Sequence, residues 1–285
     1  MSVATFIPTI WEARLMANFH KRSIADLITT KPAKIEGNKI IFNRVGAVNV
    51  KDYSGSVEWD DTNPSKVEIN MDQKKYFAFK VDDVDAVQAA GDLIDPHTQE
   101  AGSVLQETVD TFVLGLYTGA HKDNVIGTDS AAIELSPKNA YDYIVDLNTK
   151  LNMKKVPKTE RFTIINSQVL GLLSKDDRFT KQPVILENGV VEGQVINGSQ
   201  IVVSEEIHNT SGKYKILALH KSGIGHGKQL NETEAQRLQN SFADGVRGLM
   251  VYGAGVLRPE SLAVLTATIA PTTPTTPAPP SGGEA

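Results

Sequence analysis

Cysteine is absent from the 285 residues, which excludes disulfides, thiolate metal sites and cysteine nucleophiles. No stretch approaches the roughly eighteen apolar residues of a membrane span. Neither sign of charge dominates, because 29 basic residues stand against 34 acidic ones and the formal net charge is −5. The chain therefore lacks the basic excess of a nucleic-acid-binding protein, and we expect weak or no direct contact with DNA or RNA.

The first residues contain no basic segment followed by a sustained apolar run, so we expect no signal peptide. Together with the missing cysteines, this favours a protein made in a reducing cytoplasm. A hydrophobic content of 40% and a charged content of 22% are typical of a folded globular chain with one large or two ordinary domains.

Patterns for metal or cofactor binding are also missing. Only His220 and His226 lie near each other, and their spacing matches no usual zinc site. The glycines of 223–227 resemble a dinucleotide-binding loop, but Lys228 replaces the third glycine, so we interpret this stretch as a turn. We therefore predict no metal and no cofactor.

Catalytic patterns are equally scarce. The sequence contains no Gly-x-Ser-x-Gly nucleophile motif. Pairs of acidic residues lie in turns, at helix starts or at strand ends, where capping and solvation explain them; they are 60–61, 82–83, 176–177 and 205–206. The prediction is a protein that is not an enzyme.

The longest predicted element is a helix over 95–119. Asp95 suits the N-cap, Pro96 the first helical position and Gly119 the C-terminal end. Apolar residues recur every three to four positions, and at 1.5 Å per residue the helix would be roughly 35 Å long. We expect its opposite side to form an acidic outer face, with Glu100, Glu107 and Asp110.

The segments before this helix have too little apolar surface to fold alone. We predict an arm over 1–35, with a short helix near 10–19, that packs on another part of the structure or on another subunit. From 39 to 81 the apolar residues alternate with polar ones around a turn cluster at 59–65, which indicates either a long two-stranded excursion or an ordinary hairpin within a sheet. A short helix over 81–91 should lead into the long one.

The region after the long helix reads as a compact α+β unit. A helix should begin at Ser136 and Pro137 and carry Ala140, Ile144 and Leu147 on its buried face. A helix over 167–173 is also predicted, with strands at 162–166, 184–186, 195–196, 201–203 and 215–220. Two apolar strands within 242–265 flank an Arg-Pro-Glu turn, and the Pro/Thr tail over 271–285 should be unpacked.

Two stretches resemble a known family when their order and spacing are taken together. They are FKVDDVDAVQ at 79–88, directly before the long helix, and YGAGVLRPESLAV at 252–264. From about residue 8 to residue 269 the chain resembles the major capsid proteins of tailed bacteriophages, which have the Hong Kong 97-type fold.

The resemblance implies an α+β fold with five parts. These are an N-terminal arm (1–35), an extended β-hairpin called the E-loop (36–81), a peripheral P-domain (82–124 and 236–270) with the spine helix 95–119, an axial A-domain (125–235), and the disordered tail (271–285). It also implies self-assembly into hexamers and pentamers of an icosahedral shell around double-stranded DNA.

The partners implied are copies of the chain, a portal and a separate scaffolding protein, with no membrane, and assembly would occur in the cytoplasm of the host bacterium. Exposed aromatic and charged positions suggest the subunit contacts Trp11, Arg14, Phe19, Trp59, Asp60, Asp61, Tyr76 and Phe77. If the spine helix lines the inside of the shell, the carboxylates of Glu100, Glu107 and Asp110 would face the lumen and repel packaged DNA.

Three alternatives stay open. An encapsulin-type shell that holds cargo protein shares the fold. A surface or adhesion protein would explain the Pro/Thr tail, although such a protein should carry an export signal. An enzyme that uses the loop at Gly223 is the remotest of the three.

Overall fold

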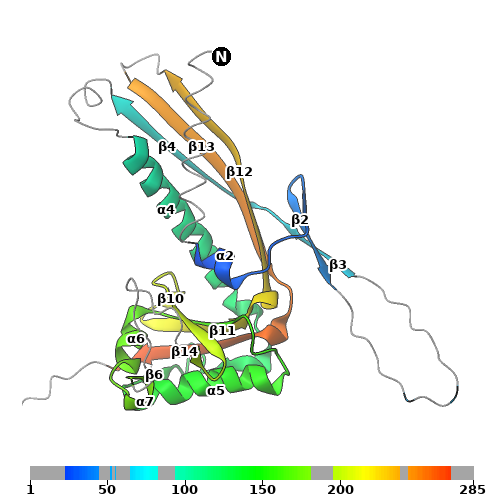
Figure 1. Ribbon diagram of the computed structural model, residues 1–285. Coiled ribbons are helices and arrows are strands. Elements are labelled where there is room, and N and C mark those ends of the chain that lie inside the picture. The colour runs from blue at the N-terminus through cyan, green and yellow to red at the C-terminus, as the bar shows by residue number, and fades with distance from the viewer. Residues whose placement is uncertain are drawn as a thin grey trace, which may run out of the picture.

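The protein is described by a computed structural model that covers residues 23–44, 65–82, 94–180, 195–237 and 243–270, with Asp52 and Gly55. It is elongated, with a long sheet-and-helix region above a wider α+β region (Figure 1). The upper region combines strands from both halves of the chain with one long helix, and the lower region contains an eight-stranded sheet.

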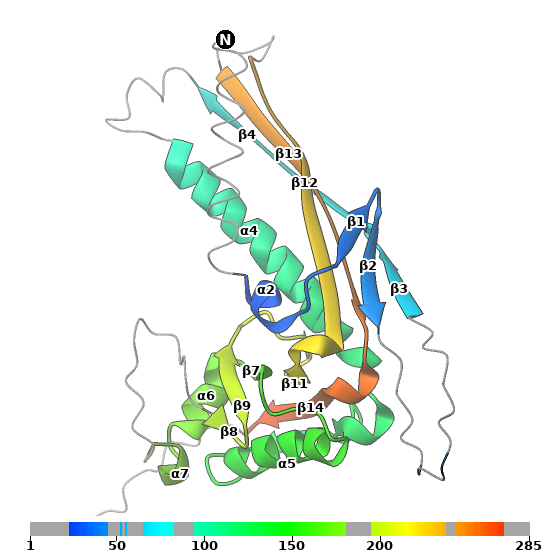
Figure 2. The same cartoon turned by 45° about the vertical axis from the view of Figure 1, so that its right-hand side comes forward.

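The upper region is built on a three-stranded antiparallel sheet. Its order is β12 (Ile224–Arg237), β13 (Ala243–Val256) and β4 (Gln73–Asp82). The helix α4 (Ile94–Leu114) runs along one face of this sheet (Figures 1 and 2). Phe112 of α4 meets Tyr252 of β13 edge to face, with ring centroids 5.4 Å apart. Burial of these apolar side chains holds the helix on the sheet.

A second small sheet lies against the other face of β12. It contains β1 (Lys34–Glu36), β2 (Lys39–Arg44) and β3 (Ser65–Asn70), in that order. Ile40 and Phe42 of β2 pack directly on the backbone of β12, where a Cβ atom on Gly225 would lie 2.6 Å from the Phe42 ring. Glycine is therefore needed at this point of β12 because the two backbones approach closely.

The lower region is an eight-stranded mixed sheet with a core on each face. Its main order is β5 (Val125–Ile126), β14 (Leu262–Ile269), β11 (Lys213–His220), β7 (Arg161–Ile165), β9 (Ser199–Val203) and β8 (Val195–Ile196), with β6 (Ile133–Leu135) beside β14 and β10 (Asn209–Thr210) beside β11. Side chains of β11 alternate between the two cores: Leu217 and Leu219 belong to one, and Ile216 and Ala218 to the other. Strands that are buried on both faces have continuous apolar sequences.

The two cores connect the regions. One contains α4, the upper sheet and one face of the lower sheet, together with the short helix α2 (Ile24–Ile28). The other lies between the opposite face of the lower sheet and the helices α5 (Ala140–Met153), α6 (Ser167–Leu173) and α7 (Asp177–Thr180). Short 3-10 helices make the connections: η1 (Gly115–Gly119), η2 (Lys122–Asn124), η3 (Lys221–Gly223) and η4 (Pro259–Ser261).

Most predicted elements of the lower region are present. The helix after Pro137 is α5, the helix over 167–173 is α6, and the strands near 162, 195, 201 and 215 are β7, β8, β9 and β11. The long helix is also confirmed, but its last predicted turn is the 3-10 helix η1. The predicted helix at 10–19, the strand at 184–186 and the tail lie outside the described residues, as does the predicted helix at 81–91 from residue 83 on. Residues 81 and 82, its first two positions, belong to β4.

The prediction of a turn at 223–227 is wrong. Gly225 and Gly227 lie inside β12, whose glycines make room for Phe42 and Ile40. The predicted boundary between 235 and 236 consequently falls within a strand. β14, which was expected in the P-domain, pairs with β11 in the lower sheet.

Candidate assembly surfaces

β4 presents the two contact candidates that fall within the described residues. It is an edge strand, and β13 is its one partner in the described part of the chain. The Tyr76 side chain is 80% exposed, whereas the neighbouring Phe77 is half-buried, packs on the core and lies close to Gly248. Successive side chains of a strand point to opposite faces. Tyr76 is therefore available to another molecule, and Phe77 serves mainly the fold of its own chain.

Lysines line the same edge. Lys74, Lys75 and Lys80 are all exposed. Lysine on an edge strand discourages uncontrolled pairing with other strands, because each added neighbour would have to accommodate the charge. A partner at β4 must therefore offer polar or acidic groups as well as an apolar surface for Tyr76.

The exposed stripe of α4 contains Glu100, Val104, Glu107 and Thr111. Three of these positions are polar, and the Val104 side chain is half exposed. Glu100 and Glu107 therefore lie on the acidic face that the periodicity predicts. The surface has few apolar atoms, so it suits solvent or a charged neighbour better than a dry contact.

The prediction that Asp110 belongs to this outer face is wrong. Its side chain is buried, and its carboxylate accepts hydrogen bonds from the N–H groups of Ala25 (2.8 Å) and Ile24 (3.2 Å) and from the hydroxyl of Ser23 (3.3 Å). Asp110 thus satisfies the free N–H groups at the start of α2. Burial raises the pKa of Asp110, although these three hydrogen bonds act in the opposite direction.

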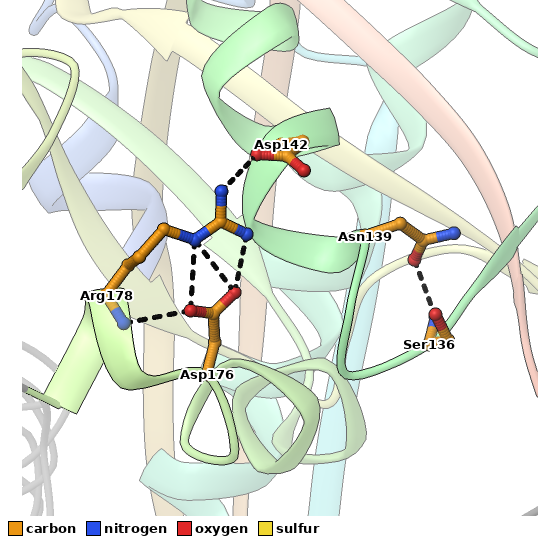
Figure 3. A network of polar contacts seen from close by, with 5 residues as sticks. All are labelled: Ser136, Asn139, Asp142, Asp176 and Arg178. Atoms are coloured by element: carbon orange, nitrogen blue, oxygen red, sulfur yellow. Dashed lines mark hydrogen bonds and ion pairs between the residues drawn. The ribbon is translucent and has the colours of Figure 1, made fainter.

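A polar network fixes one end of α5 (Figure 3). The guanidinium of Arg178 on α7 binds the carboxylate of Asp176 at 2.7 Å and that of Asp142 on α5 at 2.6 Å, and it lies 4.7 Å from the Tyr141 ring centre. Hydrogen bonds from Arg178 lower the pKa of Asp176. The network joins α7 to α5 next to residues 181–194, which lie outside the described part.

The acidic pairs serve the fold where they are described. Asp176 accepts the N–H of Arg178 at 2.9 Å, and Glu205 accepts that of Ser167 at 2.8 Å. Glu206 accepts the hydroxyl of Thr111 at 2.5 Å and so ties the lower region to α4. Their side chains are thus used in capping and in links between elements, as the sequence indicated.

The described residues offer little for a metal or a small molecule. The described residues contain no group of three or more potential metal ligands. A shallow depression of about 350 Å³ lies between α5 and β5, lined by Val125, Ile126, Asp146, Thr149, Lys150 and Met153. One carboxylate and one lysine in an open, mixed surface do not form a catalytic constellation. No described helix is long and apolar enough to span a membrane.

The other predicted contact residues lie outside the described residues. In the arm they are Trp11, Arg14 and Phe19, and in the hairpin connection they are Trp59, Asp60 and Asp61. The sequence did not point to the part-buried ion pair of 2.6 Å between Asp26 of α2 and Lys228 of β12. Alternation of glycine with polar residues at 225–229 was the available signal for a strand covered on both faces.

Comparison with known proteins identifies the family. A family model described as phage capsid protein matches residues 66–281, about three quarters of the chain. The chain belongs to the phage capsid protein family. No curated protein matches it.

Solved structures confirm the Hong Kong 97-type fold. A structure from Mycobacterium phage Che8 is 28% identical, with a TM-score of 0.61, and the match covers 81% of this chain and 85% of that one. The capsid of Ralstonia phage GP4 is 8% identical, with a TM-score of 0.68 and coverage of 90% and 93%. The SrpI encapsulin of Synechococcus elongatus is 15% identical, with a TM-score of 0.57, and the match covers 86% of this chain and 86% of that one.

Family and fold together define the protein's class. It is a structural protein of the phage capsid shell and not an enzyme, and it forms part of the virion. Capsid shells are built from many copies of one chain, so self-assembly is its principal interaction.

Proposed function

We propose that the chain assembles as hexamers and pentamers into the icosahedral shell of a tailed phage, around its double-stranded DNA. The observation that carries this proposal is the family match over 66–281, combined with an elongated sheet and helix joined to a compact α+β region. An extended shape gives each subunit several neighbours, so many moderate contacts can replace a single strong one.

The parts of the chain take distinct roles in this proposal. The arm (1–35) and the E-loop (36–81) reach neighbouring subunits, and the P-domain with α4 forms the body of the shell wall. The lower region is the A-domain, which surrounds the symmetry axes. We include β14 in the A-domain, because this strand belongs to the lower sheet. The A-domain then excludes β12, because β12 pairs with β13 in the upper sheet.

Assembly in the host cytoplasm would use two further proteins, a portal and a separate scaffolding protein. The packaged DNA would be enclosed without sequence-specific binding, since the chain carries a net charge of −5. Glu100 and Glu107, which are exposed on α4, are proposed to face the lumen. Tyr76 is proposed as a subunit contact, and so are Trp11, Arg14, Phe19, Phe77, Trp59, Asp60 and Asp61.

Negative-stain microscopy of the expressed chain tests this proposal directly. Closed shells or capsomers are expected, at least when scaffold and portal are supplied. Persistent monomers under every assembly condition would contradict it.

The encapsulin-like alternative rests on the structural match to the SrpI encapsulin. Shells purified from cells distinguish the two functions by their contents. A packaged enzyme without DNA would favour the cargo compartment, and nuclease-protected DNA of genome length would favour the phage capsid.

A further inference from the structure

The segment 23–30 is fastened to α4 and to β12 by both apolar and polar contacts. Ala25 and Ile28 are buried in the core that α4 shares with the upper sheet. The N–H of Thr30 donates to the carbonyl of Ile224 at 2.9 Å, which attaches the end of the segment to β12. With Asp110 at its start, the segment is held at both ends.

A part-buried ion pair and a buried histidine lie between these two ends. The carboxylate of Asp26 binds the ammonium of Lys228 on β12 at 2.6 Å, and the Lys228 side chain is only 9% exposed. His226 stands two residues before Lys228, on the same face of β12, and is 3% exposed. Its Nδ1 lies 3.7 Å from the Asp26 carboxylate. Three titratable groups thus meet under the segment.

The second nitrogen of His226 distinguishes this site. Nε2 is buried and has no hydrogen-bond partner among the residues that the structure describes. A protonated imidazole has two N–H donors, and a buried donor without an acceptor is costly. The docked segment therefore disfavours the charged form of His226. Release of the segment would admit water to the imidazole.

We propose that residues 23–30 form a proton-released latch on α4 and β12, which is docked while His226 is neutral and is released more readily when His226 takes up a proton. This latch is a property of the isolated chain and goes beyond shell formation. Residues 23–30 would be the point at which the arm separates from the long helix.

The direction of the pH effect follows from the groups around His226. Burial and, to a smaller extent, the positive charge of Lys228 lower the pKa of His226 while Asp26 opposes them, and the net result is a pKa of about 4 instead of 6.5. A histidine whose pKa is lower in the docked state stabilises docking above pH 6.5, and this stabilisation is lost as the pH falls toward 4. If release hydrates His226 fully and returns its pKa to 6.5, the equilibrium constant for docking would fall by at most about 70-fold between pH 7.5 and pH 4.5.

Two neighbouring groups modify this effect. Asp110, on α4, has a raised pKa because of burial, so it holds a proton more tightly when docked and reduces the acid release. Lys31, which follows the segment, adds positive charge near Lys228. Acid should therefore lower the equilibrium constant for docking by tens of fold, which is less than His226 alone would produce.

Hydrogen exchange of the full-length unassembled chain tests the latch. The N–H groups of Ile24 and Ala25 report on docking, because both donate to Asp110. After correction for intrinsic exchange rates, their protection should fall by tens of fold from pH 7.5 to pH 4.5, while amides of α5 stay protected. The variant His226→Gln should remove most of this pH dependence, and His208→Gln, in the lower region, should leave it unchanged.

Two results would overturn the proposal: equal protection at both pH values, or the same fall in wild type and in His226→Gln. If His226→Gln does not fold, an NMR titration of His226 in the wild type decides instead. A pKa near 4 supports the latch, and one of 6 or more refutes it. Because these measurements use unassembled protein, a failure of the shell proposal would not affect them.

Discussion

At the scale of single residues, the charge of Arg161 is satisfied by neutral oxygen atoms. Its side chain is 2% exposed. The guanidinium donates to the carbonyl of Val156 at 2.6 Å, to that of Pro157 at 3.2 Å and to the side-chain oxygen of Asn152 at 2.8 Å. These oxygens lie at the C-terminal end of α5 and in the following turn, where the helix dipole favours a cation. Burial lowers the pKa of Arg161.

The variant Arg161→Met should destabilise the fold by about 3 kcal/mol, because it keeps the apolar stem but leaves several buried acceptors unpaired. Urea unfolding of the unassembled chain measures the change. Arg258→Met is the control, since Arg258 is exposed and its replacement should alter stability by less than about 0.5 kcal/mol. Equal effects of the two variants would refute the structural role of Arg161.

Asp110 provides the second prediction at this scale. Asp110→Asn replaces an acceptor oxygen by an amide group that cannot accept the second N–H of α2, so docking of α2 should weaken by about 1–2 kcal/mol. Faster cleavage within 23–30 by a protease at pH 7.5 is the expected result. Glu107→Gln, an exposed change on the same helix, should leave the cleavage rate as in wild type; a matching increase there would count against the cap.

At the scale of elements, β12 is the strand on which the other parts of the upper region pack. One of its faces meets α2, where His226 and Lys228 lie beside Asp26, and Ile224 shares a core with α4; the other face meets β2 through glycine backbone. Both contacts require a strand whose side chains alternate between glycine and larger residues. The strand therefore joins the arm, the spine helix and the base of the hairpin into one unit.

Gly225→Ala tests this packing. The added Cβ would lie 2.6 Å from the ring of Phe42, so β2 must shift and stability should fall by about 1–3 kcal/mol. Thermal or urea unfolding measures the loss, and Phe42→Leu in the same chain should recover part of it. Gly171→Ala, in helix α6 with open space around it, should instead stabilise by about 0.5–1 kcal/mol. No difference between the two alanines would contradict the close approach.

At the scale of the whole molecule, exposed side chains decide how copies meet. Tyr76→Ala should leave the stability of the unassembled chain nearly unchanged, because the side chain is 80% exposed. If Tyr76 is buried between subunits, the protein concentration needed for assembly should rise about tenfold or more, as for other aromatic contact residues. Light scattering or sedimentation measures this threshold.

The matched control is Tyr76→Phe, which keeps the ring and should assemble almost normally. Normal assembly of Tyr76→Ala would remove this residue from the list of contacts.

The proposed position of Glu100 and Glu107 on the inner wall provides the last prediction. If both side chains face the lumen, the double variant Glu100→Gln and Glu107→Gln should let packaged DNA adhere more strongly to the wall and slow its ejection, because two repelling carboxylates per subunit are lost. The difference should shrink at high salt, where charges are screened. Glu134→Gln, an exposed change on β6, is the control. Unchanged packaging and ejection in the double variant would refute a lumen-facing role.

Local patterns in the sequence were sufficient for several elements. The capped, amphipathic stretch after Asp95 forms α4, and Ile144 and Leu147 mark the buried face of α5. These elements follow from short-range spacing and capping, which act within a few residues. The family resemblance rested on order along the chain, and the comparison over 66–281 confirms it.

Contacts between distant segments decided the rest. Asp110 has the spacing of an exposed acidic position, yet a segment more than eighty residues away in the chain buries its carboxylate. Gly225 and Gly227 have the local character of a turn, yet Phe42 and Ile40 make them part of a strand. The sequence by itself therefore determined most helices, strands and apolar faces, because those depend mainly on neighbours along the chain. Only the tertiary structure decided which charges are buried and which glycines lie under another backbone, because those depend on partners that folding brings together.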